Sequence, residues 1–361
     1  DRRVLRQRGG NPGQERLCAQ PQGRPPRLPA QSRLSTHTMA QAIRFDTVGG
    51  PEVLRLETVA VGEPGPGQAR VRHTGIAVNF IDIYQRQGIY PMPSPYVPGL
   101  EGSGVVTEVG SGVQGFSVGD KVAWPSSLGS YSQIHAVNAA SVVKVPEGVS
   151  LDVACAAMLQ GMTAHYLIAS LYEIKSGDTA LVHAAAGGVG QLLCQMISNR
   201  GATVIGTAST AEKADIARTA GANQVIRYDT EDVAAKAKEL TNGIGVDVVY
   251  DGVGQATFEG SLASLKRRGM MALFGGASGM VPAFDLQALS RMGSLFVTRP
   301  TLADYIAGPG EMQWRADEIF AEHLAGKLNF AIGKTYALQD AKDAHTDLAA
   351  RKTTGKLLLV P

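Results

Sequence analysis

The stretch TALVHAAAGGVGQLLCQMISN, residues 179–199, predicts a strand, a glycine-rich turn and a helix in that order. Residues 179–183 form a short run of strand-forming side chains. Four later apolar residues recur at helical spacing: Leu192, Leu193, Met196 and Ile197. Between these two parts, Gly187 permits a backbone to approach a pyrophosphate, and Gly190 permits the helix to pack closely on the strand. With the free N–H groups at the helix start, the turn is typical of a dinucleotide-binding site.

The turn departs from the usual dinucleotide fingerprint at one position. Ala185 stands where the first glycine is expected, so the motif reads A-x-G-x-x-G, and an ordinary tight turn is the alternative interpretation. The segments that follow repeat the same plan, which favours the dinucleotide site. Six strands separated by helical segments are predicted, at 179–183, 202–207, 223–227, 246–250, 269–274 and 294–298. This alternation predicts an α/β fold with a doubly wound parallel sheet and a ligand crevice at the carboxyl ends of its strands.

The end of the second predicted strand bears on the choice of cofactor. A carboxylate that binds the ribose 2′-hydroxyl of NADH is expected about 20 residues after the turn, but Ala208, Ser209 and Thr210 stand there. The nearest acid, Glu212, follows Ser209 at capping-box spacing, so we assign it a structural role at the next helix. Lys213 comes next. Hydroxyls and an amine suit a 2′-phosphate and favour NADPH over NADH; a solvated helix lysine is the alternative.

Charge is distributed unevenly along the chain. Residues 1–38 carry eight Arg against Asp1 and Glu15, whereas the remainder has 26 basic and 30 acidic residues. Because that remainder has an acidic balance, it does not fit a polyanion-binding protein, and nucleic acid is not expected as a partner.

Cysteine usage and hydropathy predict the compartment. Cys18, Cys155 and Cys194 show neither C-x-x-C spacing nor an even count, which indicates buried thiols in a reducing environment. No apolar run is expected to approach the roughly 18 residues of a membrane span. The sequence therefore predicts a cytoplasmic protein without a membrane span.

The first part of the chain divides into a leader and a β-rich unit. Residues 1–38 are rich in Arg, Gln, Pro and Gly without apolar periodicity, and we expect a disordered leader, with the functional protein beginning at Met39. Residues 39–164 contain many short strand-like runs broken by Gly and Pro, which is typical of a mainly antiparallel, barrel-like unit. One helix is predicted within it, at 79–86.

The second part contains the parallel sheet and a return to the first unit. Residues 165–299 are predicted to form the dinucleotide-binding domain. After residue 300 the pattern changes to two helices, near 311–325 and 340–350, and a final strand at 355–360. We expect the segment 300–361 to complete the β-rich unit.

Several segments together closely resemble the NADPH:quinone oxidoreductases, a zeta-crystallin-related family of the medium-chain dehydrogenase/reductase superfamily. They are GGPEVLRLE (49–57), AVNFIDIYQRQGIYP (77–91), VPGLEGSGVV (97–106), YEIKSGDTALVHAAAGGVG (172–190), VVYDGVG (248–254) and KRRGMMALFGGASG (266–279). The similarity runs from about Met39 to Pro361. It implies a GroES-like catalytic domain, a Rossmann cofactor domain, a homodimer and NADPH-dependent reduction of a quinone.

The resemblance also assigns roles to individual residues. Asn79 and Tyr84 match polar residues beside the nicotinamide, and Tyr90 matches a tyrosine near the quinone, so these three are the candidate catalytic residues. A helix cap is the alternative role for Asn79, and core packing is the alternative for Tyr84. The candidate cofactor contacts are Tyr84, Tyr166, Gly187, Gly188, Val189, Gly190, Ser209, Thr210, Lys213, Tyr228, Phe274, Gly275, Thr301 and Arg351.

The residues also argue against a metal site. Zinc alcohol dehydrogenases of the same superfamily bind zinc through cysteines and a G-H-E histidine, but Ala77 and Leu100 stand at or beside the first two of these positions. Glu101 alone cannot hold a catalytic zinc. The histidines lack metal-binding spacing, and His183 is interpreted as structural. Without a Lewis acid, alcohol oxidation is disfavoured, whereas an electron-poor quinone chiefly requires orientation over the nicotinamide.

Two alternatives to quinone reduction remain open. One is NADPH-dependent reduction of the activated C=C bond of an enone or alkenal, since related zinc-free members use similar sites. The other is zeta-crystallin-like binding of AU-rich RNA, to which the Arg-rich leader would contribute. The acidic body and the lack of an aromatic-basic motif argue against RNA.

Overall fold

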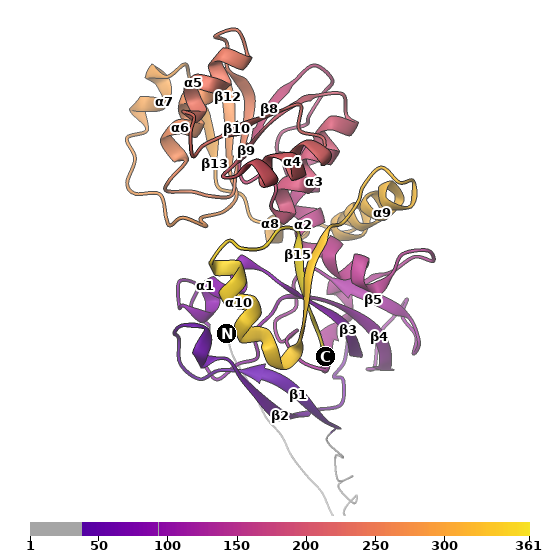
Figure 1. Ribbon diagram of the computed structural model, residues 1–361. Helices are drawn as coiled ribbons and strands as arrows, with labels where there is room; N and C mark the ends of the chain where they lie inside the picture. Colours follow the sequence, from indigo (N-terminus) through magenta and orange to yellow (C-terminus); the bar gives the residue numbers. More distant parts are fainter. Residues whose placement is uncertain (1–37, 93) are drawn as a thin grey trace, which may run out of the picture. The chain divides into compact units, whose positions relative to one another are not determined.

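The computed structural model describes residues 38–92 and 94–361. The predicted disordered leader, 1–38, lies outside these residues apart from Thr38, which begins β1 (Thr38–Arg44). β1 pairs with β2 (Arg55–Val61) in an antiparallel ribbon (Figure 1).

The cofactor candidate residues lie around a six-stranded sheet. Its strands are β8 (Thr179–Val182), β9 (Thr203–Ala208), β10 (Gln224–Arg227), β11 (Val246–Asp251), β12 (Leu265–Leu273) and β13 (Phe296–Thr298). Every neighbouring pair is parallel, and the order is β10-β9-β8-β11-β12-β13. This is the doubly wound order that reverses direction between the first and fourth strands, so the predicted fold class is confirmed.

Helices cover both faces of this sheet, as the labels in Figure 1 indicate. They are α3 (Gly188–Asn199), α4 (Ala211–Thr219), α5 (Val233–Leu240), α6 (Phe258–Ser264) and α7 (Gln287–Arg291). Because side chains alternate along a strand, Val182 packs in the same core as Leu192 of α3, whereas Leu181 packs in another core with Leu262 of α6. The strand is therefore apolar on both faces, which is why it reads as a continuous apolar run.

One of the six strands begins earlier than predicted. β12 starts at residue 265 and not at 269, and its pairing with β11 shifts register between Val246 and Val248. Arg268 lies inside this strand with φ +58°. The polar run KRRG carries no apolar alternation, so sequence patterning could not reveal a strand that begins before a bulge.

The candidate catalytic residues follow a strand of a second, mainly antiparallel sheet. Its order is β14-β15-β3-β4-β5-β7, with β6 beside β3. The strands are β3 (Gln68–Val78), β4 (Glu101–Val109), β5 (Lys121–Trp124), β6 (Ile134–Asn138), β7 (Val143–Lys144), β14 (Ile332–Ala337) and β15 (Lys356–Val360). The C-terminal strand β15 pairs with β3, so residues more than 270 positions apart lie side by side.

The remaining helices connect or flank the two sheets. They are α1 (Phe80–Arg86), α2 (Leu151–Tyr166), α8 (Leu302–Tyr305), α9 (Glu311–Leu324) and α10 (Ala341–Ala349). α2 continues through a π-helical turn, Leu167–Leu171. In the described part of the chain, the 21-residue stretch Leu151–Leu171 is long and apolar enough to cross a membrane, so our expectation that no run approaches that length was wrong. Of its apolar window 72% is buried inside the protein, which is typical of a core helix.

Candidate functional site

The glycine-rich turn leaves the carboxyl end of β8 and enters α3. Ala184 adopts φ +50°, and Gly187 caps the helix in an extended conformation. A Cβ on Gly190 would lie 2.2 Å from the carbonyl oxygen of Ala184, so only glycine allows the helix to approach the turn this closely. The backbone N–H groups of Gly188 and Val189 lie in the first turn of α3, where helical bonding leaves them free for an anion.

The end of β9 differs in one detail from the prediction. Thr210, and not Ser209, caps α4, because its hydroxyl accepts the backbone N–H of Lys213 at 3.2 Å. The predicted capping box between Ser209 and Glu212 is therefore wrong by one residue. Glu212 still lies in the first turn of α4, where a carboxylate favours the helix dipole.

Two cations come together beside this strand end. Lys213 Nζ donates to the backbone carbonyl of Arg351 at 3.0 Å, and the Arg351 guanidinium donates to the carbonyl of Ala277 at 3.1 Å. Tyr228 follows β10 directly and is 49% exposed, with its N–H bonded to the carbonyl of Ala208. An exposed aromatic ring next to hydroxyls and two cations fits a purine ring that carries a nearby phosphate.

A buried polar network stands behind the turn. Asp251, at the end of β11, accepts hydrogen bonds from the hydroxyls of Thr257 and Ser261, both at 2.7 Å. The Ser261 hydroxyl also pairs with His183 Nε2 at 3.0 Å, and the other ring nitrogen pairs with the Thr207 hydroxyl at 3.2 Å. Burial lowers the pKa of His183. His183 is thus a fully paired, neutral structural residue, as the sequence suggested.

The loops after β11 and β12 close against each other. The N–H of Phe274 donates to the carbonyl of Asp251 at 2.9 Å. A Cβ on Gly275 would lie 2.4 Å from the carbonyl oxygen of Gly252, so this position also requires the smallest side chain. The candidates Phe274 and Gly275 therefore border the carboxyl ends of the central strands.

The tyrosines of α1 and the loop after it face this region. Tyr84 and Tyr90 pack edge to face with ring centroids 5.7 Å apart. Burial raises the pKa of Tyr84 and nearby Tyr90 adds to this rise, while the Gly276 backbone and the charges of Arg299 and Arg351 partly offset it. Tyr84 thus lies close to the loop that contains Gly275 and to the turn that contains Arg351, and it also packs on Phe80 of its own helix.

The candidates Tyr166 and Thr301 lie further along the chain. Tyr166 is only 1% exposed and stacks on Tyr305 with centroids 4.3 Å apart. Thr301 is exposed and precedes α8 as its N-cap residue. Both residues thus belong to the junction of α2 with α8, and Tyr166 exposes almost none of its surface.

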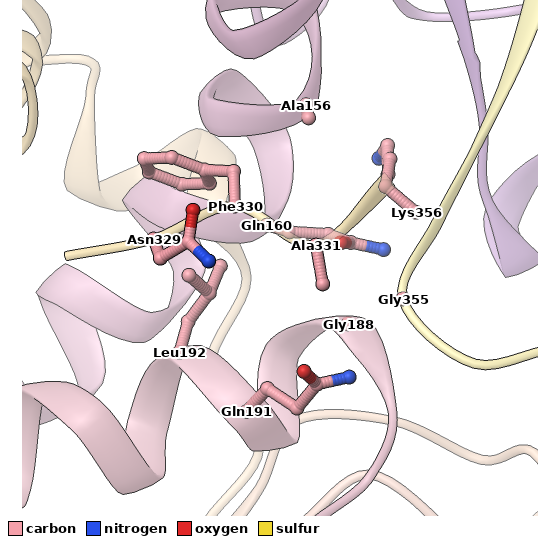
Figure 2. A pocket seen from close by; sticks show the side chains of 10 residues that line it. All are labelled: Ala156, Gln160, Gly188, Gln191, Leu192, Asn329, Phe330, Ala331, Gly355 and Lys356. Carbon is pink, nitrogen blue, oxygen red and sulfur yellow. The ribbon is translucent and has the colours of Figure 1, made fainter. Parts of the chain in front are cut away.

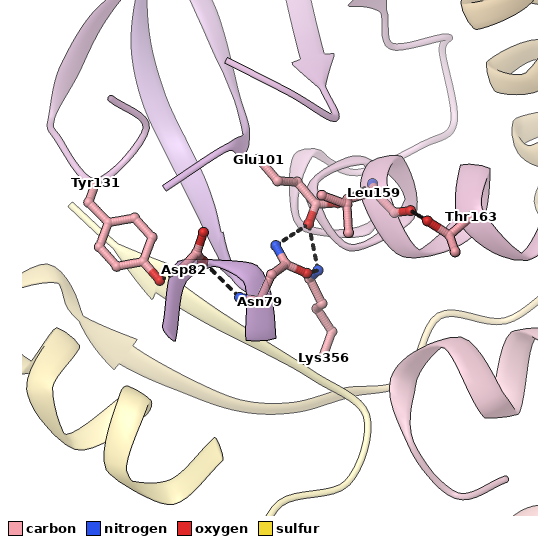
Figure 3. Close-up of polar contacts among 7 residues, drawn as sticks. All are labelled: Asn79, Asp82, Glu101, Tyr131, Leu159, Thr163 and Lys356. Atoms are coloured by element: carbon pink, nitrogen blue, oxygen red, sulfur yellow. Dashed lines mark hydrogen bonds and ion pairs between the residues drawn. The ribbon is translucent and has the colours of Figure 1, made fainter. Parts of the chain in front are cut away.

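Asn79 forms a three-residue polar cluster with Glu101 and Lys356, as Figure 3 shows. Asn79 Oδ1 accepts a hydrogen bond from Lys356 Nζ at 2.7 Å, and its Nδ2 donates to Glu101 Oε2 at 2.9 Å. Lys356 Nζ also pairs with Glu101 Oε2 at 2.5 Å, and Glu101 Oε1 accepts the backbone N–H of Leu159 at 2.6 Å. Asn79 is the N-cap residue of α1, yet its side chain bonds to this cluster.

A second buried network adjoins the first through α1 (Figure 3). Asp82 Oδ2 accepts the N–H of Asn79 and the hydroxyl of Tyr131, at 2.8 and 3.0 Å. Tyr131 contacts His345 Nε2, and Arg86 donates to His345 Nδ1. Because a guanidinium only donates, the neutral ring must carry its proton on Nε2. Burial raises the pKa of Asp82 to about 7, and its Oδ1 has no partner among the described residues.

The role of Lys356 was not predicted from the sequence, and Glu101 was considered only as an isolated candidate for a metal ligand. The available signal was chemical: Lys356 is a single cation at the start of the apolar strand KLLLV, and a charged residue inside such a strand requires a buried partner. The identity of that partner depended on strand pairing across the chain.

Comparisons with known proteins cover almost the whole described chain. A family model described as an alcohol dehydrogenase GroES-like domain matches residues 65–169, and one described as a zinc-binding dehydrogenase matches residues 188–319. The quinone oxidoreductase of Pseudomonas aeruginosa is 46% identical over 90% of this chain and 100% of its own length.

The chain is also similar to solved structures of quinone oxidoreductases. A quinone oxidoreductase from Pseudomonas syringae has a TM-score of 0.88 and 46% identity, covering 90% of this chain and 100% of that one. The Escherichia coli quinone oxidoreductase, solved in complex with NADPH, has a TM-score of 0.88 and 42% identity, covering 89% of this chain and 100% of that one.

A GroES-like unit joined to a parallel dinucleotide-binding sheet defines a medium-chain dehydrogenase/reductase. The 46% identity to quinone oxidoreductases over 90% of the chain narrows this class to one family, and it confirms the resemblance inferred from the sequence. The chain belongs to the quinone oxidoreductase family.

The zinc named in one of the family descriptions does not fit the residues present. Within residues 38–92 and 94–361, no group of three or more His, Cys, Asp or Glu side chains converges on a possible metal position. Glu101, which we considered as a ligand, is occupied by the Lys356 ammonium. A cation in that position opposes a second cation, so no step of the chemistry is assigned to zinc.

Proposed function

We propose that this protein is an NADPH-dependent quinone reductase. The observation that carries the proposal is the end of β9, where two hydroxyl residues and the paired cations Lys213 and Arg351 stand in place of a carboxylate. A dianionic 2′-phosphate gains charge-assisted hydrogen bonds there, whereas a ribose 2′-hydroxyl finds no acceptor carboxylate. Family membership and the NADPH complex of the Escherichia coli relative support the same reading.

The remaining proposed cofactor contacts lie mostly after the carboxyl ends of the parallel strands. The N–H groups of Gly188 and Val189 would bind the pyrophosphate at the start of α3, and Tyr228 would pack on the adenine. We propose that Phe274, Gly275 and Thr301 contact the cofactor along the same crevice. Tyr166 is proposed as a cofactor contact by resemblance alone, since its ring is buried against Tyr305.

Quinone reduction requires the acceptor to be oriented more than it requires the acceptor to be activated. Bound NADPH supplies the hydride. The chain holds the acceptor ring beside Tyr84 and Tyr90, and Asn79 donates an N–H to a carbonyl oxygen that gains charge as hydride arrives. The product oxygen then takes its proton from water. Holding two reactants in this way can contribute roughly 7 to 11 kcal/mol.

The proposal includes a site that works without metal. The Glu101 carboxylate accepts hydrogen bonds from three donors, which belong to Lys356, Asn79 and Leu159. They occupy both of its oxygens, so this carboxylate is already paired with a cation from the chain itself.

Turnover of two acceptors by one preparation tests the assignment. With NADPH, we expect 1,4-benzoquinone to be reduced with a higher kcat/KM than an alkenal such as hexenal. Reduction of the alkenal alone would contradict quinone reduction and support the C=C alternative. A gel shift with AU-rich RNA, using protein that starts at Met39, tests the nucleic-acid alternative, and we expect no salt-sensitive complex.

Several finer proposals concern assembly and location. We propose a homodimer formed through the sheet edge at β13, where Phe296 is 56% exposed and the nearby apolar side chains of Met280 and Leu286 are 67% and 71% exposed. Sedimentation as a monomer at micromolar concentration would contradict this. Cys155 and Cys194 are buried free thiols, which supports a reducing, cytoplasmic environment.

The division of the chain is likewise a proposal. Residues 39–164 and 300–361 would form the GroES-like domain and 165–299 the Rossmann domain. The helix α2 spans the first of these boundaries, and β15 joins the first unit through its pairing with β3.

A further inference from the structure

Glu101 and Lys356 form an ion pair that is almost completely buried. Their exposed fractions are 0% and 2%, and Asn79 beside them is 4% exposed. Ala77, the strand partner of Glu101, packs in an apolar cluster with Cys155 and Leu358. A buried ion pair is often no more stabilising than well-packed apolar residues of the same volume, so its presence calls for a reason other than stability.

The pair determines the orientation of the Asn79 amide. The two ends of this amide are nearly the same size, but one can only accept hydrogen bonds and the other can only donate them. Lys356 donates to Oδ1 and Glu101 accepts from Nδ2. Rotating the amide by 180° would place its N–H groups against an ammonium and its oxygen against a carboxylate, and both contacts would be repulsive. One orientation is therefore strongly favoured.

One donor of Asn79 remains after these contacts are made. The amide nitrogen carries two hydrogens, and within the described residues Nδ2 donates only to Glu101. An ammonium on the oxygen of an amide also draws electron density from its nitrogen and strengthens the remaining N–H as a donor.

Lys356 links this amide to the dinucleotide turn. Gly355, the preceding residue, pairs with Gly187 through an isolated parallel bridge. Figure 2 shows Lys356 and Gly355 on one side of a small cavity that Gly188 and Gln160 also line. The backbone of this segment contacts the turn, and the lysine side chain reaches Asn79. The amide is thus positioned relative to the same turn that would hold the cofactor.

We propose that Lys356 and Glu101 are positioning residues that fix the Asn79 amide, so that its free N–H is offered to the oxygen of the hydride acceptor. This inference rests on the proposed quinone reductase function. The pair acts through Asn79 and takes no part in bond making or breaking.

The test removes the pair without leaving a charge buried alone. We compare wild type with the double variant Lys356→Met/Glu101→Met, the single variant Asn79→Ala, and the triple variant. The matched control is Lys266→Met/Asp247→Asn, which removes a Lys–Asp pair near the amino ends of β11 and β12, in the six-stranded parallel sheet and away from Asn79. Steady-state kcat and KM are measured with NADPH and 1,4-benzoquinone.

A second readout does not depend on turnover. The side-chain amide hydrogens of Asn79 are followed by proton exchange in 15N-labelled protein, with the Asn79→Ala variant for assignment. In wild type we expect the hydrogen bonded to Glu101 to exchange slowly, and in the double variant we expect this protection to be lost.

We expect the double variant to lose roughly 10- to 100-fold in kcat, because small displacements of an oriented group have effects of that size. The KM for NADPH should stay within about twofold, and the control variant should keep its kcat. If the pair acts through Asn79, the triple variant should be no slower than Asn79→Ala, since residues that act as a unit are not additive.

Three results would overturn the proposal. They are an unchanged kcat in the double variant, a further loss when the pair is removed from Asn79→Ala, and an unprotected Asn79 amide in wild type. The last measurement decides the matter even if the double variant does not fold. If wild-type protein reduces no quinone, the proposed function fails, whereas the exchange measurement still reports on the positioning of Asn79.

Discussion

Lys213 illustrates how much a single residue determines at the cofactor site. Its ammonium stands at the end of β9, bonded to the Arg351 carbonyl, in a region where an NADH-binding protein would have a carboxylate. The contact uses one of the three N–H donors of the ammonium, so two donors remain for a phosphate.

We predict that Lys213→Ala weakens NADPH selectively. A hydrogen bond to a charged group contributes about 1.5 to 3 kcal/mol, so KM for NADPH should rise roughly 10- to 150-fold. KM for NADH should change little, because that cofactor has no 2′-phosphate. Lys236→Ala, which removes a surface lysine of α5 paired with Glu239, is the control. Equal losses for both cofactors would exclude a phosphate contact.

Single residues also mark the limit of what the sequence could predict. The absence of a carboxylate after β9 could be read directly, because it depends on positions close to the glycine turn. The cap of α4 was misassigned by one residue, since the residue that leaves the extended conformation is decided by backbone geometry. The pairing of Lys356 with Glu101 spans 255 positions, and no local pattern connects them.

At the scale of elements, α3 and the turn before it depend on glycine for packing. Gly190 approaches the backbone of Ala184 and Ala185 so closely that a Cβ would lie 2.2 and 2.8 Å from their atoms. Gly260, in the interior of α6, has open space around the same position. The two residues form a matched pair for separating close packing from simple helix propensity.

We predict opposite effects for the same substitution at these two sites. Gly190→Ala should displace α3 from the turn, lower the stability and raise the Kd for NADPH, as thermal unfolding and fluorescence titration would measure. Gly260→Ala should raise the free energy of unfolding by about 0.4 to 1 kcal/mol, because it reduces the freedom of the unfolded chain. Equal NADPH affinity in both variants would show that close packing at residue 190 is not required.

Most elements could be predicted, because the apolar pattern that identifies a buried strand or helix lies within one short stretch of sequence. Five of the six strands of the parallel sheet begin within two residues of their predicted starts, since buried strands are apolar runs. The exception, β12, begins in the polar run before a bulge. The length of the apolar run through α2 was underestimated, because small residues such as Ala154, Ala156 and Ala157 make its apolar character inconspicuous.

At the scale of the whole molecule, buried ionisable groups link stability to pH. Asp82 is fully buried, and burial raises its pKa to about 7 from the value of 3.8 expected when exposed. Between pH ~4 and ~7 the unfolded chain therefore releases a proton that the folded protein keeps. The contribution of Asp82 to stability falls as the pH rises through this window, and the loss is complete above it.

We predict that Asp82→Asn removes this dependence. Asn cannot ionise, yet it can still accept the N–H of Asn79 and bond to Tyr131. Between pH 5 and pH 8, urea unfolding should show the variant gaining up to about 3 kcal/mol of stability relative to wild type, because about two pH units separate pH 5 from the folded-state pKa. Asp343→Asn, at an exposed position of α10, is the control. A variant that is less stable than wild type at pH 8 would mean that the Asp82 carboxylate is ionised and well paired.

The architecture as a whole could be anticipated only in part. The alternation of strands and helices predicts the parallel sheet, and short strands broken by Gly and Pro predict the antiparallel unit. The return of the C-terminal strand was expected, but its pairing with β3, which places Lys356 against Asn79, depends on register between distant segments. Such register emerges only when the two sheets are assembled.

The most direct test of the account measures initial rates of 1,4-benzoquinone reduction with NADPH and with NADH, on protein treated with a strong chelator and checked for residual metal. We predict that NADPH is used with the higher kcat/KM and that chelation leaves the rate unchanged. Equal use of NADH, or a rate that chelation abolishes and added zinc restores, would contradict it.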